Sequence, residues 1–268
     1  MEYSTTTQDA LKQRRRQAAL RRQKQVRRQR ICLVALLLFA GAGIIYQGKS
    51  EKQPSKEEVI VFNIEEYPES LQALYENNPE ARTFVKDYKT EAGKEHTIDL
   101  TEEVSQSSIP AFLQWDERWG YETYGSDMLA ITGCGPTCLS MVLCGLTKDA
   151  AWSPIKVAKF AEENGFYEAG NGSKWSLMSE GAEQLGLTSE ELPLDEARIK
   201  NELREGNPII CTMGPGDFTT SGHYIVLRGI TKEGQILIND PNSKKRSKQK
   251  WNLDEIVGQI KNLWVYHV

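Results

Sequence analysis

Two thiols, Cys134 and Cys138, lie four residues apart in the stretch TGCGPTCLSM, which covers residues 132–141. The Gly-Pro pair between them indicates a helix entrance, because proline at the first helical position loses no hydrogen bond. We therefore predict a helix over residues 136–146, with Cys134 at its N-terminal end. Unpaired N–H groups and the helix dipole at that end stabilise a thiolate, so Cys134 is the candidate nucleophile. Cys138 lies one turn further along, on a face shared with apolar residues, and is predicted to pack in the core.

A nucleophilic thiolate needs an imidazole for proton transfer, and the sequence offers three histidines, His96, His223 and His267. Of these, His223 begins a predicted strand, SGHYIVLRGI, whereas His96 lies in a polar stretch and His267 is the penultimate residue. A turn over residues 231–234 (TKEG) predicts a hairpin that brings Asp240 within a residue or two of His223 across the two strands. A carboxylate in that place can hold the imidazole in one tautomer and orientation.

Gln114, in the stretch IPAFLQWDERWG, supplies a side-chain amide that can join the N–H of Cys134 in binding an oxyanion. The resulting order along the chain is Gln114, Cys134 at a helix start, His223 on a strand and Asp240 on the next strand. This order is typical of papain-type thiol hydrolases, in which a thiolate attacks a peptide carbonyl group.

Each of these four residues also has a purely structural interpretation. Cys134 could be a small buried hydrophobe, and His223 could be a hydrogen-bonded core histidine. Asp240, which a proline follows, could initiate a turn, and Gln114 could be a surface amide. A zinc site is disfavoured because the C-x3-C spacing of Cys134 and Cys138 lacks the usual metal-binding pattern, and a disulfide along one helix face would be strained. We therefore expect neither a metal nor an organic cofactor.

Residues 109–268 resemble the peptidase C39-like family of papain-like cysteine peptidases through four motifs in the same order: LQWDERWG, ITGCGPTCLSMVL, SGHYIVLRGI and INDPN. The resemblance implies a papain-like fold. It also implies these roles: Cys134 as nucleophile, His223 as general base and acid, Asp240 as the orienting residue and Gln114 as oxyanion donor. In papain the glutamine lies only a few residues before the cysteine, whereas Gln114 precedes Cys134 by twenty residues. Members of the C39-like family commonly have this longer insert.

The order of predicted elements in residues 109–268 indicates an α+β fold. Helix signals come first, over residues 136–146, 153–165, 175–184 and 195–204. Strand signals follow, over residues 208–213, 223–230, 235–240 and 262–266, with one more helix at 253–260. Helices before strands favour a mostly antiparallel sheet, in which the hairpin through 231–234 is the clearest local signal.

Three further residues are candidates for a substrate cleft. Trp175 lies at a predicted helix start in GNGSKWSLM, and Gly214 and Gly216 lie in the loop MGPGDFTTSG, which leads to His223. Glycines would let an extended peptide approach the backbone, although a core tryptophan and an ordinary loop are the alternatives. The basic run SKKRSKQK, residues 243–250, is predicted to be a solvated loop.

Residues 1–30 form a basic arm with ten Lys or Arg against two acidic residues, whereas the whole chain has a net charge of −4. The next sixteen residues, 31–46 (ICLVALLLFAGAGIIY), carry no charge and would span roughly 24 Å as a helix. This is somewhat short of a bilayer core, and Arg30 and Lys49 can snorkel to cover the difference. We predict a single transmembrane helix with the arm in the cytoplasm and the rest of the chain outside. The alternative is a cleaved signal peptide with small residues at 40–42, which would leave the domain secreted.

Residues 47–108 are polar and acidic, with fourteen Asp or Glu against seven Lys or Arg. Two short amphipathic patterns, around Leu71–Tyr75 and Phe84–Tyr88, predict helices that dock on the domain that follows. A partly ordered linker is the alternative. The sequence thus divides into a basic cytoplasmic arm (1–30), a transmembrane helix (31–46), an acidic linker or stalk (47–108) and a catalytic domain (109–268).

The sequence as a whole predicts a single-pass membrane protein at a bacterial cell surface, with an extracytoplasmic cysteine peptidase domain. We expect a peptide or protein substrate, a monomer, and membrane contact through residues 31–46. The basic arm alone could bind nucleic acid, but the apolar segment after it favours a membrane flank, so no nucleic-acid partner is expected. Two alternatives stay open: an amidase acting on peptidoglycan stem peptides, and a catalytically silent papain-like module that binds a peptide or wall component. A cytoplasmic leader peptidase attached to an ABC exporter is disfavoured, because the charge bias places the domain outside.

Overall fold

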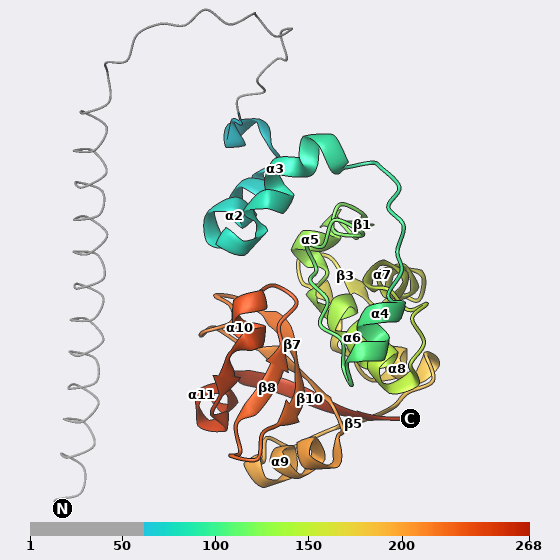
Figure 1. Cartoon of the computed structure of the whole chain (residues 1–268), viewed down its shortest axis with the longest axis vertical. Coiled ribbons are helices and arrows are strands. Elements are labelled where there is room, and N and C mark those ends of the chain that lie inside the picture. The colour runs from blue at the N-terminus through green and yellow to red at the C-terminus, as the bar shows by residue number, and fades with distance from the viewer. Residues whose placement is uncertain (1–61) are drawn as a thin grey trace, which may run out of the picture. The chain divides into compact units, whose positions relative to one another are not determined.

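A six-stranded antiparallel sheet lies at the centre of the computed structural model, which describes residues 62–268 (Figure 1). Its strands lie in the spatial order β5 (Thr188–Glu191), β10 (Ile260–His267), β6 (Ile209–Met213), β7 (His223–Ile230), β8 (Ile236–Asn239) and β9 (Lys250–Trp251). Every neighbouring pair in this sheet is antiparallel. The predicted mixture of helices with an antiparallel sheet is therefore confirmed.

Side chains alternate between the two faces of this sheet, as the two-residue period of a strand requires. On β6 and β7, Ile210 and Val226 belong to one buried cluster, whereas Cys211 and Ile225 belong to another. The helices that complete the two clusters are α6 (Cys134–Thr147) and α7 (Pro154–Glu163) on the first face, and α9 (Glu196–Glu205) and α11 (Leu253–Val257) on the second. Helices thus cover both faces of the sheet.

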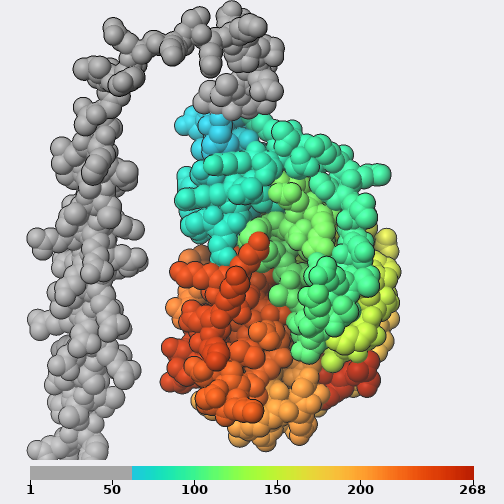
Figure 2. Space-filling model, in the orientation of Figure 1, coloured from blue at the N-terminus to red at the C-terminus, as the bar shows by residue number. Residues whose placement is uncertain are grey.

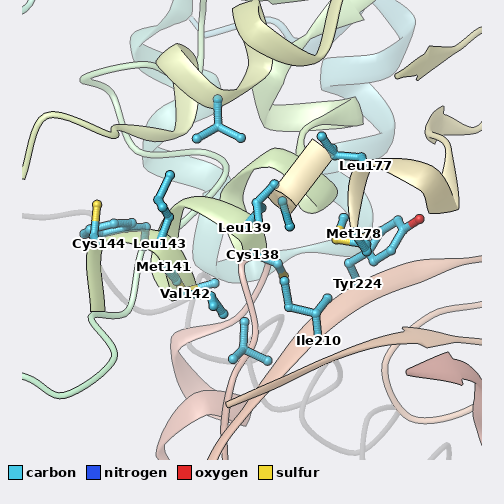
Figure 3. Packing of buried hydrophobic residues seen from close by; sticks show 14 of the residues in the cluster. Cys138, Leu139, Met141, Val142, Leu143, Cys144, Leu177, Met178, Ile210 and Tyr224 are labelled. Atoms are coloured by element: carbon cyan, nitrogen blue, oxygen red, sulfur yellow. The ribbon is translucent and has the colours of Figure 1, made fainter. Parts of the chain in front are cut away.

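Helix α6 is buried nearly throughout, and the eleven consecutive residues from Gly135 to Gly145 are all buried. A helix that is apolar on all sides is stable only inside a core, and α6 packs between α7 and β7 (Figure 3). It begins at Cys134, two residues before the predicted start. Cys138 is fully buried in this cluster, which confirms the prediction that it packs in the core.

Short elements surround α6. They are β1 (Thr123–Tyr124) paired with β2 (Asp127–Met128), α5 (Leu129–Thr132), β3 (Tyr167–Glu168) paired with β4 (Gly172–Ser173), η3 (Trp175–Leu177) and α8 (Glu180–Gln184). The predicted continuous helix over residues 175–184 is wrong. At Ser179 the backbone has φ −106° and ψ −85°, which interrupts the helical turns and separates η3 from α8.

The described part of the predicted linker is helical. Its elements are η1 (Ile64–Glu66), α2 (Glu69–Asn77), η2 (Pro79–Ala81), α3 (Arg82–Glu91) and α4 (Thr101–Gln106). Leu71 of α2 and Phe84 of α3 are buried in one cluster with Trp115 and Ala130 of the domain that follows. Figure 2 shows this segment lying directly against the rest of the described chain. The two predicted helices therefore form and dock as expected.

The sequence-based prediction missed several short elements, of which β5 and α10 matter most for the sheet and the site. The edge strand β5 displays mostly exposed polar side chains and pairs through its backbone with β10, so it carries no apolar alternation. The predicted solvated loop at 243–250 contains a short helix, α10 (Lys244–Lys248), whose Arg246 N–H is accepted by the Ser243 hydroxyl. The prediction of a loop was wrong there because it relied on the basic composition and did not consider Ser243 as an N-cap residue.

The predicted basic arm (1–30) and transmembrane helix (31–46) lie outside the described residues. Within residues 62–268, no helix is both long enough and apolar enough to cross a bilayer. These residues form one compact unit, which includes the second part of the predicted linker.

Candidate active site

Cys134 is the first residue of α6, and its side chain is partly exposed. Gly133 before it has no room for a side chain, because an added Cβ would lie 2.4 Å from the carbonyl oxygen of Leu129. Gly135 is similarly constrained, since a Cβ there would lie 2.6 Å from the hydroxyl oxygen of Ser173. The two glycines let the preceding turn and the β3–β4 hairpin close around the start of α6, with the thiol at its N-terminal end.

The surroundings of Cys134 favour the thiolate. Burial by itself raises the pKa of this thiol, because a charged sulfur loses its solvation. The His223 imidazole outweighs that effect through a hydrogen bond and its charge, and the N–H groups of Tyr224 and Gly135 act in the same direction, so the pKa of Cys134 lies below its ordinary value. Cys138 shows the opposite shift, since burial and the nearby Cys134 charge both raise its pKa.

His223 is the first residue of β7, and the antiparallel register of β7 and β8 pairs Val226 with Asn239. Asp240 therefore follows the end of β8 at the edge where His223 begins, as the sequence predicts. The Nε2 atom of His223 lies 2.8 Å from Oδ1 of Asp240, which leaves the Nδ1 side of the ring for Cys134. Burial lowers the pKa of His223, but the Asp240 carboxylate, followed by Cys134, raises it to about 10.

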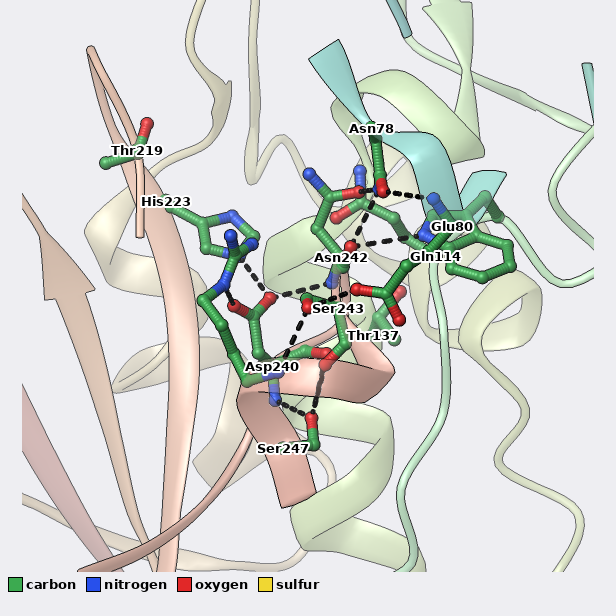
Figure 4. Close-up of polar contacts among 12 residues, drawn as sticks. Asn78, Glu80, Gln114, Thr137, Thr219, His223, Asp240, Asn242, Ser243 and Ser247 are labelled. Carbon is green, nitrogen blue, oxygen red and sulfur yellow. Dashed lines mark hydrogen bonds and ion pairs between the residues drawn. The ribbon is translucent and has the colours of Figure 1, made fainter. Parts of the chain in front are cut away.

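Asp240 is almost completely buried, with 1% of its surface exposed. Both carboxylate oxygens are nevertheless engaged: Oδ1 also accepts the N–H of Asn242 at 2.8 Å, and Oδ2 accepts Nε of Arg246 (Figure 4). Burial raises the pKa of this carboxyl group, but His223 first and Arg246 second hold it below its ordinary value. A buried carboxylate with these partners stays charged and fixed in orientation.

Arg246 is a site residue that the sequence reasoning missed. It lies on α10 inside the run that was predicted to be a solvated loop. The signal that could have found it is Ser243, a residue type that caps helices, placed three residues before an arginine and directly after the Asp-Pro-Asn turn. A short helix at that point turns an arginine back toward Asp240.

Gln114 is buried close to α5 rather than in hydrogen-bond contact with Cys134. Its Nε2 donates to the carbonyl oxygen of Ala130 at 2.7 Å and makes a longer contact of 3.4 Å with that of Ile131. Its backbone N–H donates to the carbonyl oxygen of Pro241 at 2.8 Å, which ties it to the segment after Asp240. Within the described residues its Oε1 atom is buried without a hydrogen-bond partner.

A pocket of about 620 Å³ opens beside the thiol and the imidazole. Its lining includes Cys134, His223, Ile131, Glu168 and Trp175. Half of the Trp175 surface is exposed, while its ring packs edge-on against Trp264 with a centroid distance of 5.9 Å. The structure therefore brings Trp175 to the same pocket as the two candidate catalytic groups.

Gly214 and Gly216 do not line this pocket. The N–H of Gly214 donates to the carbonyl oxygen of Gln259 at 2.7 Å. An added Cβ at Gly216 would lie 2.1 Å from Oε1 of Gln259. The two glycines thus allow their loop to pack closely on residues 259 and 261, and their contact with a substrate stays a prediction.

The arrangement can perform nucleophilic chemistry at a carbonyl group. It combines a thiol with a lowered pKa, an imidazole with a raised pKa and a buried carboxylate that fixes the ring. The first N–H groups of a helix lack intrahelical acceptors, so they can donate to a developing oxyanion next to Cys134. Among residues 62–268, no group of three or more His, Cys, Asp or Glu side chains is arranged to hold a metal ion.

The chain resembles known proteins at the level of a family and of a solved structure. A sequence model of the Peptidase_C39 like family matches residues 106–267, which is more than half of the chain. Among solved structures, the chain is similar to the peptidase domain of Streptococcus ComA, a bi-functional ABC transporter involved in a quorum sensing pathway. The identity is 21%, over 50% of this chain and 89% of that domain, with a TM-score of 0.38. No curated protein matches this chain significantly.

Proposed function

Because the chain belongs to the Peptidase_C39 like family of cysteine peptidases, we propose that it hydrolyses peptide bonds through Cys134, His223 and Asp240. The observation that carries this proposal is the pair of contacts around one imidazole. Asp240 binds Nε2 of the ring at 2.8 Å, and the ring in turn lowers the pKa of the Cys134 thiol. A nucleophile, a proton carrier and an orienting carboxylate are the three groups that acyl transfer requires.

In this mechanism the Cys134 thiolate attacks the carbonyl carbon of the scissile peptide bond and forms a tetrahedral oxyanion. Protonated His223 then gives its proton to the leaving amine, the C–N bond breaks, and a thioester remains on Cys134. Neutral His223 next takes a proton from a water molecule, whose oxygen attacks the thioester. Collapse of the second tetrahedral species releases the carboxylic acid product and restores the thiolate with its imidazolium partner.

We assign oxyanion binding to the N–H of Cys134 and the side chain of Gln114. The Nε2 group of Gln114 carries two hydrogens, and the Ala130 carbonyl takes one of them at 2.7 Å. The other makes only a 3.4 Å contact with the Ile131 carbonyl, next to the pocket, so a developing oxyanion can compete for it.

We further infer that residues 31–46 anchor the protein in a bacterial cell membrane with the peptidase unit outside the cytoplasm. The support is the uncharged run of sixteen residues, preceded by ten Lys or Arg in residues 1–30. The substrate is then a peptide or protein at the cell surface, and the enzyme acts as a monomer. Sequencing the N-terminus of the mature protein tests this inference, because a cleaved chain begins after residue 42.

The full chain in its membrane or in detergent allows a direct test of the peptidase. We expect iodoacetamide to alkylate Cys134 in preference to Cys138, and a peptide library to be cleaved by the wild type but not by Cys134→Ala. Purified cell wall serves as a second substrate. Release of stem peptides from cell wall, without cleavage of the peptide library, would identify an amidase. Alkylation of Cys138 with Cys134 untouched would overturn the assignment. Equal performance of Cys134→Ala and wild type in cells would identify a binding module.

A further inference from the structure

The N-terminal helical segment makes direct polar contact with the part of the chain that carries Asp240. The Nδ2 atom of Asn78 lies 2.8 Å from both the backbone oxygen and the side-chain oxygen of Asn242. Glu80, two residues later, binds at the start of α10, where Oε1 accepts the Ser243 hydroxyl and Oε2 accepts the N–H of Lys245 at 3.1 Å. More than 160 residues of chain separate these partners.

Two of these contacts lead on to Asp240, one through Asn242 alone and the other through Ser243 and then Arg246. On one route, the N–H of Asn242 donates to Oδ1 of Asp240, the same oxygen that holds His223. On the other route, the Ser243 hydroxyl accepts the N–H of Arg246, whose Nε binds Oδ2 of Asp240. Figure 4 shows Asn78, Glu80, Asn242 and Ser243 close to Asp240.

The segment that presents Asn78 and Glu80 is itself fixed. The Oδ1 atom of Asn78 caps η2 by accepting the N–H of Glu80 at 3.0 Å. The helices on either side are held by Leu71 and Phe84, which are buried in the cluster with Trp115. A carboxylate on a packed segment of this kind loses little further freedom when it binds α10, so it can act as a rigid support.

We propose that Glu80, assisted by Asn78, is a positioning residue that orients Asp240 by holding the turn and short helix after it. This inference rests on the proposed roles of Asp240 and His223. Helix α10 has only five residues and cannot keep its own position, because isolated turns of helix are marginal in water. Glu80 supplies the acceptors that fix its first turn. The sequence segment predicted to be a linker thus contributes to the geometry of the site.

The consequence is a defined kinetic signature. Without Glu80, Arg246 and Asn242 hold Asp240 less firmly, the imidazolium is less stabilised, and the thiolate forms at higher pH. We expect Glu80→Ala to lower kcat about tenfold with little change in KM, a size typical of residues that share one hydrogen-bond network. The pH midpoint of Cys134 alkylation should rise. Glu80→Gln, which keeps one acceptor oxygen, should fall between Glu80→Ala and the wild type.

Glu76→Gln is the matched control, because Glu76 lies on α2 in the same segment, is exposed, and makes no hydrogen bond or ion pair with the described residues. The variants are compared in the full chain by alkylation across pH, by peptide hydrolysis and by thermal unfolding. A double-mutant cycle then combines Glu80→Gln with Arg246→Gln. If the two residues act in series, Glu80→Gln should change kcat by no more than about twofold once Arg246 has been replaced.

An unchanged alkylation profile in Glu80→Ala, even with a lower unfolding temperature, would reduce Glu80 to a structural role and overturn the inference. Alkylation needs only the thiol and its imidazole, so this readout does not depend on peptide hydrolysis. If the wild type is alkylated at Cys134 but cleaves no peptide, the proposed function is refuted. The alkylation profiles of the Glu80 variants would still decide whether Glu80 positions Asp240.

Discussion

Helix α6 and the segment from Asp240 into α10 each hold one proposed catalytic group, but they hold it by different means. Cys134 is held by its own helix, in which the eleven residues that follow it are all buried. Asp240 is held by polar groups on other elements, His223 of β7 and Arg246 of α10, and Glu80 from the N-terminal helical segment binds Ser243 at the start of α10. Apolar packing fixes one side of the site, and charge with hydrogen bonding fixes the other.

This difference decides how each side responds to change. Apolar packing is a sum of many small contacts, so trimming one core side chain costs about 2–5 kcal/mol without moving the whole helix. A buried charge network is cooperative, because removal of one partner leaves another charge unpaired in a medium that solvates it poorly. The Asp240 side should therefore be the more sensitive to single polar substitutions and to pH, and the α6 side to steric change at its first turn.

The largest expected effect comes from the group that joins the two sides. His223→Ala should lower kcat/KM by about 10⁴-fold or more, as for other members of catalytic triads. Burial raises the pKa of Cys134 and His223 is the main group that lowers it, so the pH midpoint of Cys134 alkylation should move upward in the variant. Alkylation rates measured from pH 5 to 10 check this.

His96→Ala is the matched control for that substitution. His96 lies outside the pocket, with its Nε2 atom 3.9 Å from a carboxylate oxygen of Glu91. Its removal should leave both hydrolysis and the alkylation profile unchanged. Normal alkylation of Cys134 at neutral pH in His223→Ala would show that the imidazole does not lower the pKa of the thiol. The two sides of the site would then act independently.

The same contrast explains how much the sequence could predict. The position of Cys134 followed from local signals, since a Gly-Pro pair and an apolar run define the start of α6. The pairing of His223 with Asp240 also followed, because one turn at residues 231–234 sets the register of β7 and β8. Both predictions depended on segments that are short or adjacent in the chain.

The roles of Glu80 and Arg246, and the packing of the two loop glycines, were not predicted from local signals, and for Glu80 the reason is a long-range contact. Nothing local to Glu80 indicates that it binds Ser243, because the two residues meet only when the N-terminal helices dock on the domain. Arg246 was concealed in a basic run, whose composition is typical of solvated surface. The cleft role expected of Gly214 and Gly216 stays a prediction, and close packing on Lys261 and Gln259 explains the absence of side chains there.

Asp240→Asn should produce the next largest effect, a fall in kcat of about 10³-fold, because a neutral amide no longer stabilises the imidazolium. The substitution also changes stability in a pH-dependent way. The pKa of Asp240 is lowered in the folded state, so its contribution is present above about pH 3.8 and is lost as the pH falls. The pKa of His223 is raised to about 10, so its contribution is complete below about pH 6.5 and disappears as the pH rises toward 10.

The free energy of unfolding of the wild type should therefore exceed that of Asp240→Asn most strongly between about pH 4 and 6.5, by roughly 3 kcal/mol. The excess should shrink on both sides of this window. Urea unfolding of the two proteins at several pH values measures it. A constant difference from pH 3 to 10 would mean that the pair contributes no linked protons and that the network is weaker than the geometry indicates.

Gly133→Ala tests the α6 side by steric means. The new Cβ would lie 2.4 Å from the Leu129 carbonyl oxygen, so the first turn of α6 must move. A displacement of about 1 Å at a nucleophile costs on the order of 10²-fold in rate, and we expect that loss in kcat. Gly186→Ala, at a glycine whose Cβ would meet no atom within 4 Å but whose φ is +89°, controls for backbone effects away from the site. Comparable losses in kcat for Gly133→Ala and Gly186→Ala would show that activity is no more sensitive to the first turn of α6 than to a glycine away from the site.

Arg246→Gln should have the smallest effect of the four, a fall in kcat of about tenfold or slightly more, since a hydrogen bond between charged groups is worth about 1.5–3 kcal/mol. Its value lies in the contrast with Lys248→Gln on the same helix, because Lys248 is exposed and does not bind Asp240. The arginine neutralises the carboxylate oxygen that His223 does not bind, so its loss should raise the pKa of Asp240 and move the acid limb of the pH–rate profile to higher pH. Equal profiles for the two variants would show that charge near α10, and not the contact with Asp240, supports this side of the site.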